Sequence, residues 1–477
     1  MNIFHPVSAV TDSSAAVLYT YYKNSAYTVF VNGEKYAVTD KAEITVRGLE
    51  PDTEYEISVR AEAGGINETA AISVRTAPRG DVLDIRDFGA VGDGVTDCTE
   101  AIGASVKACP KNGTVLIKDG VYLSGPLFLK SDMTLRIGED AVLLGSPDVR
   151  DYPVFVYRFE GLEQNCYASL INTVDGEHRN IKITGGGVID ANGEKLFAAE
   201  MAENAGKRGR AVCIRNTDGV YIEGVTVRQS PAWCVHTIYC SSVTLDNVKI
   251  FTKFDENGRR YKGIYNGDGF DPDSCRDVTV FGCTIGSQDD CIAVKSGRDA
   301  EGRAVGVPTE NVLVRSCRFA SGFGCVVGSE MSGSVRNVTF ENCRFENTYS
   351  LASIKAPRGR GGVVENVVYR NCSHYYDENE FSDNKWFRGA INIDMFYGVD
   401  EFDTEMPEPV DEGTPKFRGI MFENIVSETT AGCAVYICGL PESRVNGISF
   451  RNVRCKGKSG LYVKNADIIE TDDIQIG

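Results

Sequence analysis

Short runs that alternate apolar and polar residues fill the first part of the chain. Examples are AAVLYTYY (15–22), YTVFVNG (27–33) and YEISVRAEAG (55–64), and the turns between runs carry NG or AGG. Alternation of this kind, broken by turn residues, is typical of an antiparallel β-sandwich. We therefore predict a small sandwich over residues 1–77, followed by a linker, TAPRG, at 76–80.

From residue 81 onward the chain repeats one unit: a short β-rich run, a small or polar turn, and a second short run. GVYIEGVTV (219–227), SVTLDNVKI (242–250) and NVTFENCRF (337–345) are three of the copies. One unit cannot bury its apolar face alone, but stacked units can, with Cys, Val and Phe in ladders along a common core. We predict an all-β chain in which a right-handed parallel β-helix covers residues 81–477.

Asparagine recurs at the turn of these units, where its tolerance of left-handed backbone geometry is useful. The positions are Asn247, Asn342, Asn371, Asn424 and Asn452. Extra length between the units predicts long loops at 252–276, 286–310 and 375–417. In solenoids such loops tend to build the binding face.

Composition narrows the classes of partner. A formal net charge of −17 argues against nucleic acid or an anionic membrane surface, but not against an acidic substrate at a locally basic site. Sixteen cysteines without a CxxC pair favour buried thiols in a reducing compartment over a zinc site. The start, MNIFHPVSAV, lacks the features of a secretory signal, so we expect a cytoplasmic protein; a secreted protein whose leader had been trimmed would read the same way.

Three carboxylates gather in one short span. YNGDGFDPDSC (265–275) contains Asp268, and GSQDDC (286–291) contains Asp289 and Asp290. Asp268 and Asp289 are 21 residues apart, about one coil, and coils stack about 4.8 Å apart. The acids are therefore expected on one wall of a groove. Hydrolysis of a glycosidic bond needs one protonated acid and one ionised base, and crowding raises the pKa of one of them. The alternative is a calcium site or a solvated acidic turn.

The first segment resembles a fibronectin type III module. The stretch GLEPDTEYEISVRA (48–61) carries this resemblance and puts Tyr55 at the tyrosine-corner position. Such modules most often act as spacers or packing partners, so no chemistry is assigned to this one.

Residues from about 81 to the C-terminus resemble glycoside hydrolase family 28, the polygalacturonase family, and most of all its bacterial, exo-acting branch. NGDGFDPDSC and SQDDCIAVKSG match the Asn-x-Asp-Gly and Asp-Asp motifs of the family. GSEMSGSVRNVTFENC, IKAPRGRGG and SPAWCVH match further bacterial stretches. The opening DFGAVGDGVTD is shared with the wider pectate-lyase-like group and indicates the fold only.

The resemblance implies a role for each acid. Asp289 would protonate the leaving oxygen, while Asp268 and Asp290 would position and deprotonate a water on the opposite face of the sugar. The family inverts, so no covalent intermediate is expected, and the carboxyl groups of such a site lie roughly 6.5–9.5 Å apart. Neither a metal nor an organic cofactor is required.

Two positions depart from the family pattern. Phe323 stands where the family has His, and Ser353 stands where it has Arg, whereas Lys355 is retained. Three interpretations stay open: a leaving group other than galacturonate, such as rhamnose or a decorated unit; recruitment of Arg358 or Arg360 as the clamp for a carboxylate; or a crippled site. A guanidinium grips a carboxylate through two hydrogen bonds, which Lys cannot replace.

Other residues are weaker candidates for substrate binding. Trp233 and His236 in SPAWCVH resemble a stretch that borders the groove, where an aromatic face can stack on a sugar; a buried core role is nearly as well supported. Asn266 and Gln288 flank the acids and could hold the water or a hydroxyl, or stabilise turns. Tyr397 could reach the groove from its rim.

These observations predict an inverting glycoside hydrolase acting on uronate-containing pectic chains. Exo action is preferred because the long inserts and the N-terminal module could wall off one end of the groove. The alternatives are a polysaccharide lyase on the same fold, which would use calcium and a basic residue, and a non-catalytic β-helix that binds carbohydrate. The oligomeric state is not predicted.

Overall fold

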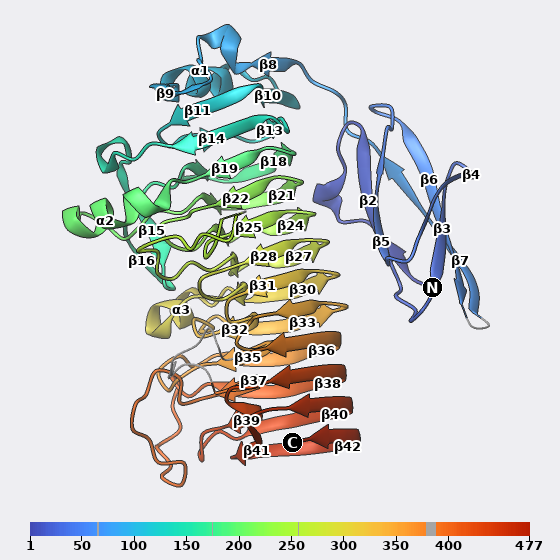
Figure 1. Cartoon of the computed structure of the whole chain (residues 1–477), viewed down its shortest axis with the longest axis vertical. Helices are drawn as coiled ribbons and strands as arrows, with labels where there is room; N and C mark the ends of the chain where they lie inside the picture. The colour runs from blue at the N-terminus through green and yellow to red at the C-terminus, as the bar shows by residue number, and fades with distance from the viewer. Residues whose placement is uncertain (64–65, 174, 256, 378–387) are drawn as a thin grey trace.

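From Val82 onward, parallel strands stack one coil above another (Figure 1). The structure is a computed structural model and describes residues 1–63, 66–173, 175–255, 257–377 and 388–477. Within these residues the coils form two parallel sheets, one of 22 strands and one of 11. The predicted all-β fold, a right-handed parallel β-helix preceded by small antiparallel sheets, is confirmed. In this part of the chain no helix has the length and apolar character needed to cross a bilayer.

Each sheet collects the same face of successive coils. The larger sheet consists of β8 (Val82–Asp84), β9 (Asp93–Asp97), β10 (Gly113–Ile117), β11 (Gly120–Ser124), β13 (Met133–Ile137), β14 (Ala141–Gly145), β18 (His178–Gly185), β19 (Val188–Asp190), β21 (Thr217–Glu223), β22 (Thr226–Arg228), β24 (Ser241–Asp246), β25 (Lys249–Phe251), β27 (Arg276–Phe281), β28 (Thr284–Gly286), β30 (Thr309–Arg315), β31 (Arg318–Ser321), β33 (Val335–Glu341), β34 (Arg344–Glu346), β36 (Val363–Tyr376), β38 (Lys416–Thr429), β40 (Val445–Lys456) and β42 (Ala466–Ile476). The smaller sheet consists of β12 (Leu127–Leu129), β17 (Ile171–Thr173), β20 (Val212–Arg215), β23 (Val235–Ile238), β26 (Phe270–Asp273), β29 (Ile292–Val294), β32 (Cys325–Gly328), β35 (Ala352–Lys355), β37 (Gly389–Asp394), β39 (Cys433–Cys438) and β41 (Ser459–Lys464).

The repeated residues form the ladders that the sequence predicts. Every turn asparagine named above has a left-handed backbone, with φ between 50° and 56°. The Asn452 amide donates to Asn424 at 2.8 Å, and Asn424 donates to Asn371 at 2.8 Å. Inside the coils, the rings of Phe340 and Tyr369 stack with centroids 4.7 Å apart. Each coil therefore satisfies its turn and buries its apolar face against the next coil.

The cysteines behave as small buried hydrophobes. All sixteen are free thiols, and all but Cys433 are buried. Cys317, Cys343 and Cys372 occupy matching positions in consecutive coils, where burial raises the pKa of each thiol. The prediction of packed, unpaired thiols is confirmed for these positions.

The N-terminal segment forms two antiparallel sheets. The first contains β1 (Ile3–Phe4), β2 (Ser14–Tyr19) and β5 (Glu43–Arg47), and the second contains β3 (Ala26–Val31), β4 (Glu34–Thr39), β6 (Glu54–Ala63) and β7 (Ile66–Arg75). The Tyr55 hydroxyl accepts a hydrogen bond from the Glu50 amide at 2.8 Å, which is the contact of a tyrosine corner. The fibronectin type III assignment and the boundaries 1–77 and 81–477 stay predictions.

This N-terminal module packs against the larger sheet of the β-helix, beside its middle coils (Figure 1). The Arg315 guanidinium donates to the backbone carbonyls of Tyr19 at 2.9 Å and Ala42 at 3.1 Å. Thr45 donates to the Asp246 carboxylate at 2.6 Å. The module is thus attached by buried polar contacts as well as by apolar packing.

The inserts project from the opposite side, next to the smaller sheet (Figure 1). They include α3 (Asp299–Val305), which lies within the predicted insert 286–310. The hairpin of β15 (Val154–Phe159) and β16 (Leu162–Tyr167), with α2 (Gly193–Glu203), forms a further insert that the repeat pattern did not indicate. Part of the predicted insert 375–417 falls outside the described residues.

The first coil carries the one other α-helix of the described chain. It is α1 (Thr99–Ala108), which packs Ile102 and Val106 onto the end of the core. Three short 3-10 helices are η1 (Val7–Ala9), η2 (Ile85–Phe88) and η3 (Val149–Asp151).

Candidate active site

The three predicted acids lie at the entrances to two neighbouring strands of the smaller sheet. Asp268 precedes β26, and Asp289 and Asp290 precede β29. Phe270 pairs with Ile292, 22 residues later, so the register sets Asp268 against Asp290. The sequence predicted Asp289, 21 residues after Asp268, as the partner. The coil has 22 residues at this point, so Asp289 lies one position before the residue that faces Asp268.

Glycines allow the backbones to approach at this point. A Cβ atom on Gly269 would lie 2.4 Å from the Cys291 carbonyl oxygen, and one on Gly322 would lie 2.4 Å from the carbonyl oxygen of Asp289. Contacts that short do not occur between real atoms, so both positions require glycine. The small residues around the acids therefore bring the coils together.

Lys355 holds one of the acids. From β35 its ammonium donates to both carboxylate oxygens of Asp290, at 2.9 and 3.3 Å. Asp290 is only 2% exposed, and the ring of Tyr397 lies 4.8 Å from the Lys355 ammonium. Burial disfavours the ammonium, but the charge of Asp290 outweighs it and raises the pKa of Lys355. The pair is therefore a fixed, ionised unit.

Asp289 lies in a different environment. Burial, and after it the charge of neighbouring Asp290, raises the pKa of its carboxyl to about 6. The Asp289 carboxylate also accepts a hydrogen bond from the Asp290 amide at 3.0 Å. Adjacent residues thus lie in different electrostatic environments: Asp290 is paired with the Lys355 ammonium, whereas burial raises the pKa of Asp289.

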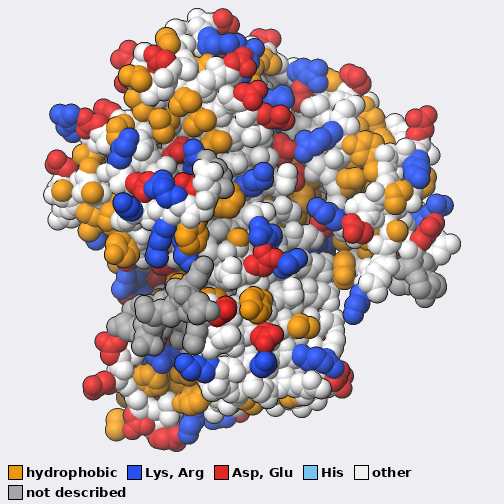
Figure 2. Space-filling model, viewed as in Figure 1, with side chains coloured by type: hydrophobic (Ala, Val, Ile, Leu, Met, Phe, Trp, Pro, Cys, Tyr) orange, Lys and Arg blue, Asp and Glu red, His pale blue; other side chains and the backbone are white. Residues whose placement is uncertain are grey.

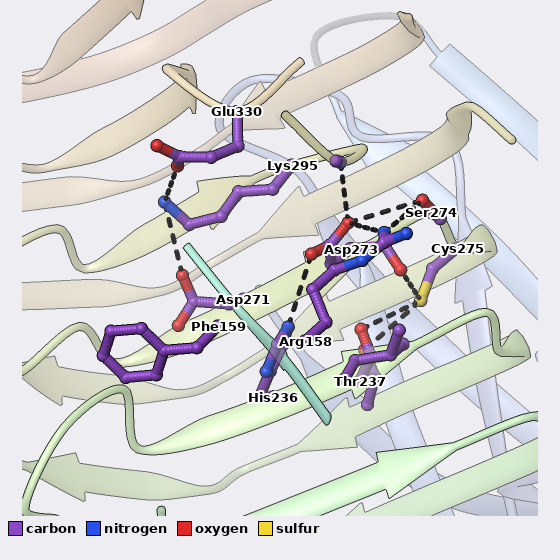
Figure 3. A network of polar contacts seen from close by, with 12 residues as sticks. Arg158, Phe159, His236, Thr237, Asp271, Asp273, Ser274, Cys275, Lys295 and Glu330 are labelled. Atoms are coloured by element: carbon purple, nitrogen blue, oxygen red, sulfur yellow. Dashed lines mark hydrogen bonds and ion pairs between the residues drawn. The ribbon is translucent and has the colours of Figure 1, made fainter. Parts of the chain in front are cut away.

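A buried lysine, Lys295, lies between Glu330 and Asp271 (Figure 3). The Lys295 ammonium lies 3.0 Å from Glu330 and 3.8 Å from both Asp268 and Asp271. Burial raises the pKa of Asp271 to about 8, and burial together with the charges of Asp271 and Asp289 raises the pKa of Asp268 well above its usual value.

Sequence reasoning did not assign these three additional residues, Asp271, Lys295 and Glu330. Each falls inside a motif used for the family resemblance, and Lys295 ends the apolar run CIAV. A lysine directly after a buried strand was the available signal, because an ammonium there must be buried with a carboxylate partner.

Trp233 and His236 require a correction, because the structure buries both. Trp233 is 2% exposed and His236 is fully buried. The Trp233 ring stacks on Phe159 with centroids 5.7 Å apart, and the Lys295 ammonium lies 4.6 Å from it. The indole therefore forms part of the floor under the charged cluster and offers no open face for a sugar.

His236 belongs to a second polar network beside the first (Figure 3). Its Nε2 lies 3.6 Å from the Asp273 carboxylate, which also pairs with Arg158 at 2.8 Å. Burial lowers the pKa of His236 to about 3, so the imidazole is neutral. This network braces β26 against the β15–β16 hairpin.

Asn266 and Gln288 brace the turns that carry the acids. The Asn266 side-chain oxygen accepts a hydrogen bond from Arg208 at 2.6 Å. The Gln288 side-chain oxygen accepts one from the Gly267 amide at 3.0 Å. Both residues are partly exposed, and these contacts correspond to the turn-stabilising alternative.

The two departures from the family pattern lie in the coils beyond Asp290. The Phe323 amide donates to the Asp289 carbonyl at 3.0 Å, and its ring meets that of Tyr349 with centroids 4.3 Å apart. The Ser353 hydroxyl accepts a hydrogen bond from Asn392 at 3.0 Å. An aromatic pair and a neutral hydroxyl thus occupy positions where the family resemblance implied cationic groups.

Arg358 and Arg360 are both engaged by other carboxylates. Arg358 binds Glu442 at 2.6 Å, and Arg360 binds Asp299 at 2.5 Å and the Ser329 carbonyl at 2.9 Å. These contacts do not favour the interpretation that either guanidinium acts as a clamp for a substrate carboxylate.

The N-terminal module does not border the site. It packs on the larger sheet, whereas the acids lie on the smaller one, so the expectation that the module walls off one end of the groove is wrong. The β15–β16 hairpin lies on the site's side instead. The Arg298 amide donates to the Gly161 carbonyl at the hairpin tip at 3.0 Å, and the Glu163 amide donates to Glu301 of α3 at 2.8 Å.

Charge is mixed over the visible face of the molecule (Figure 2). Several Lys and Arg side chains gather on the left of the view, among the inserts, although the net charge of the chain is −17. The inserts on this face are therefore not uniformly acidic.

Comparison with known proteins identifies proteins of similar sequence and fold. The chain is 30% identical over 408 residues to a "Probable polygalacturonase" of Vitis vinifera, covering 81% of this chain and 76% of that protein. Its fold matches the family 28 exopolygalacturonase of Yersinia enterocolitica with a TM-score of 0.82 at 20% identity, over 99% of this chain and 98% of that one. The hyperthermoactive exopolygalacturonase of Thermotoga maritima matches with a TM-score of 0.71 at 28% identity, over 83% and 92%.

Residues 158–471 match glycosyl hydrolases family 28, a span that contains the acids, both lysines and the inserts around them. The chain therefore belongs to glycosyl hydrolases family 28 and is a polygalacturonase-like glycoside hydrolase.

Proposed function

We propose that this protein is an inverting hydrolase that acts from one end of galacturonate-containing pectic chains. The observation that carries the proposal is the difference between adjacent acids: Asp290 is ion-paired with Lys355, whereas the pKa of Asp289 is raised. A general acid and an ionised base side by side are what glycoside hydrolysis requires.

Asp289 is the proposed general acid. Its raised pKa, about 6, keeps the carboxyl protonated in mildly acidic solution, so that it can donate a proton to the leaving oxygen. Its partial exposure leaves it accessible to a glycosidic oxygen. The family resemblance implies a His next to the general acid. In this chain burial keeps the carboxyl protonated without that His.

Asp290 and Asp268 are the proposed bases. The Lys355 ammonium stabilises the ionised form of Asp290, and the register brings Asp268 beside it from the neighbouring coil. The two carboxylates would orient one water and remove its proton as it attacks the anomeric carbon from the face opposite to Asp289. The sugar leaves with inverted configuration, and no covalent sugar–enzyme bond forms.

The leaving group is proposed to be something other than galacturonate, such as rhamnose or a decorated unit. A galacturonate there would need a cation for its carboxylate, but Ser353 stands at the position of the family Arg and binds Asn392. In the preceding coil, the partly exposed ring of Phe323 packs against Tyr349. Aromatic side chains favour an apolar sugar face over a charged group.

Exo action is supported by the inserts. The β15–β16 hairpin contacts Arg298 and Glu301 across the coils, which favours a closed end over an open groove. The Yersinia and Thermotoga relatives are exopolygalacturonases by name. Because the N-terminal module packs elsewhere, the inserts are the structural support for exo action within this chain.

Product analysis on a panel of pectic oligosaccharides tests the proposal. Galacturonan and rhamnogalacturonan fragments are incubated with the protein and with Asp289→Asn as the inactive control. We expect new reducing ends, single units released from one end, and inverted anomers by NMR. Ultraviolet-absorbing products would indicate a lyase instead. Binding without products from the wild-type chain would indicate a carbohydrate-binding protein.

A further inference from the structure

Lys295 has no part in the acid–base roles described above, yet it is the buried centre of the charged cluster (Figure 3). Its side chain is 4% exposed, and three carboxyl groups surround its ammonium. A buried ammonium costs several kcal/mol unless it is well paired. Its retention at this position calls for a physical role.

The ammonium is not shared equally among its neighbours. Glu330 lies at 3.0 Å, within hydrogen-bonding distance, whereas Asp268 and Asp271 both lie at 3.8 Å, beyond it. Glu330 is itself held in place, since Ser329 donates to it at 2.9 Å and Arg360 lies 3.7 Å away. The Lys295 charge therefore favours Glu330 and only partly compensates the two aspartates.

A contact with an aromatic ring also restricts the position of the Lys295 ammonium. Its nitrogen lies 4.6 Å from the centroid of the Trp233 ring, and that ring is stacked on Phe159. A cation over an indole is attracted to the ring face. The stacked rings therefore help to hold the ammonium in place.

We infer that Lys295 and Glu330 act together as positioning residues that set the protonation of Asp268, the lysine favouring the ionised carboxylate and the glutamate opposing it. This inference rests on the proposed role of Asp268 as a base. In this arrangement Glu330 draws the ammonium toward itself and adds a negative charge of its own. Asp268 is then ionised only above a threshold pH that the pair determines.

Other charged groups face the same cluster and must be counted. Around Asp268 and Lys295 they are Asp271 on β26, Asp289 and Asp290 before β29, Arg208 from the segment after α2, and Lys355 on β35 through its pair with Asp290. Of the charged groups in the described chain, those paired with Glu330 are Lys295, at 3.0 Å, and Arg360, at 3.7 Å. Changing Glu330 therefore alters the cluster mainly through the lysine.

The test compares the pH dependence of kcat/KM in Lys295→Gln and Glu330→Gln. In Lys295→Gln the loss of the ammonium should raise the pKa of Asp268. The acidic limb of the kcat/KM profile should therefore move to higher pH by about one unit or more. Removing the Glu330 charge leaves the ammonium to the aspartates and should move the same limb to lower pH, by about half a unit. Opposite shifts from two neighbouring neutralisations would support the inference, since a merely structural role predicts loss of stability without them.

His236→Gln serves as the matched control. It changes a buried neutral residue in the adjoining network, so it should lower Tm without moving the limb. Shifts of Lys295→Gln and Glu330→Gln in the same direction, or no shift in folded protein by circular dichroism, would overturn the inference. If Lys295→Gln does not fold, the result for Glu330→Gln is decisive. A shift of its acidic limb to lower pH supports the inference, and a shift to higher pH or no shift overturns it.

A readout that needs no substrate separates this inference from the proposed function. The chain has two tryptophans, so Trp386→Phe leaves Trp233 as the only one, directly beneath Lys295. The fluorescence of Trp233 should change with pH as the cluster titrates. The midpoint of that change should move to higher pH in Lys295→Gln and to lower pH in Glu330→Gln. Opposite fluorescence shifts without any hydrolysis would reject the proposed function but keep the inference, whereas hydrolysis without opposite shifts would reject the inference alone.

Discussion

Asp289 and Asp290 are neighbours in sequence, yet their stability effects should have opposite signs. Burial raises the pKa of Asp289 to about 6, so this carboxyl opposes folding increasingly as pH rises above the unfolded pKa of about 3.9, and fully above about 6. Asp290 is the partner of the buried Lys355 ammonium. The pair shows that chemical identity alone does not determine what a carboxylate contributes.

The first prediction is that Asp289→Asn abolishes activity but stabilises the fold. The kcat should fall by about 10²–10⁴-fold because the general acid is lost. Because a raised carboxyl pKa costs stability only at pH values where the carboxyl of the unfolded chain is ionised, the Tm of the variant should exceed that of the wild type at pH 8. The two should converge at pH 4, near the carboxyl pKa of the unfolded chain. Calorimetry at both pH values measures this difference.

Asp290→Asn is the control for that experiment. It should also abolish activity, but it leaves Lys355 buried without its charged partner and should destabilise the fold by about 3–5 kcal/mol. A lower Tm for Asp289→Asn at pH 8 would contradict the assignment of Asp289 as the group with the raised pKa.

The second prediction for a single residue concerns Phe323. Its backbone binds that of Asp289, and it stands where the family has His. In Phe323→His the imidazole adds a polar, ionisable group beside the acid and should lower the pKa of Asp289. The basic limb of the pH–rate profile should therefore move to lower pH. Phe323→Leu keeps the site apolar and should leave the limb in place; identical limbs in the two variants would refute the desolvation argument.

The coil is the element that brings the acids together, and its spacing depends on glycine. A methyl group on Gly269 would meet the Cys291 carbonyl oxygen at 2.4 Å, which neighbouring backbone cannot easily yield. Gly269→Ala should therefore separate the coils of Asp268 and Asp290. We expect a loss of about 1–3 kcal/mol in the free energy of unfolding. A displacement of about 1 Å at the acids should also lower kcat by about 10²-fold.

Gly103→Ala is the matched control for the coil prediction. Gly103 lies in α1, where an added methyl group meets nothing within 4 Å. Because alanine favours a helix over glycine, this variant should gain up to about 1 kcal/mol and keep full activity. Equal behaviour of the two variants in denaturant unfolding and kinetics would show that the contact at Gly269 is unimportant.

At the scale of elements, the sequence predicts the repeat far better than the inserts. The turn asparagines and the Cys and Phe ladders recur because each coil contacts mainly its neighbours, so local periodicity encodes the contacts. The β15–β16 hairpin has no such signal, since its partners Arg298 and Glu301 lie more than a hundred residues away. The register of 22 at Asp268 likewise emerges only when strands pair.

For the whole molecule, the attachment of the N-terminal module is the feature that pH should affect. Glu43 is 5% exposed at this interface, and burial raises the pKa of its carboxyl. The ionised form therefore opposes docking above the unfolded pKa of about 4.3. Glu43→Gln should raise the Tm at pH 8 and have no effect at pH 4, as scanning calorimetry can show.

Glu341→Gln provides the opposite control at the same interface. Glu341 pairs with Arg315, which donates to the module's carbonyls, so its neutralisation should lower the Tm at pH 8. A stabilising effect of both substitutions, or of neither, would contradict the account of the interface.

The coil repeat, the antiparallel start of the chain and the three acids near one strand edge could all be predicted from the amino-acid sequence, because they depend on periodicity and on residues close along the chain. The remaining features became visible once the folded chain was described. Trp233 and His236 are buried, Lys295 is shared by Glu330 and two aspartates, and the module packs away from the site. Each of these depends on contacts between distant residues and on the charge and solvent access that those contacts create, which no local pattern records.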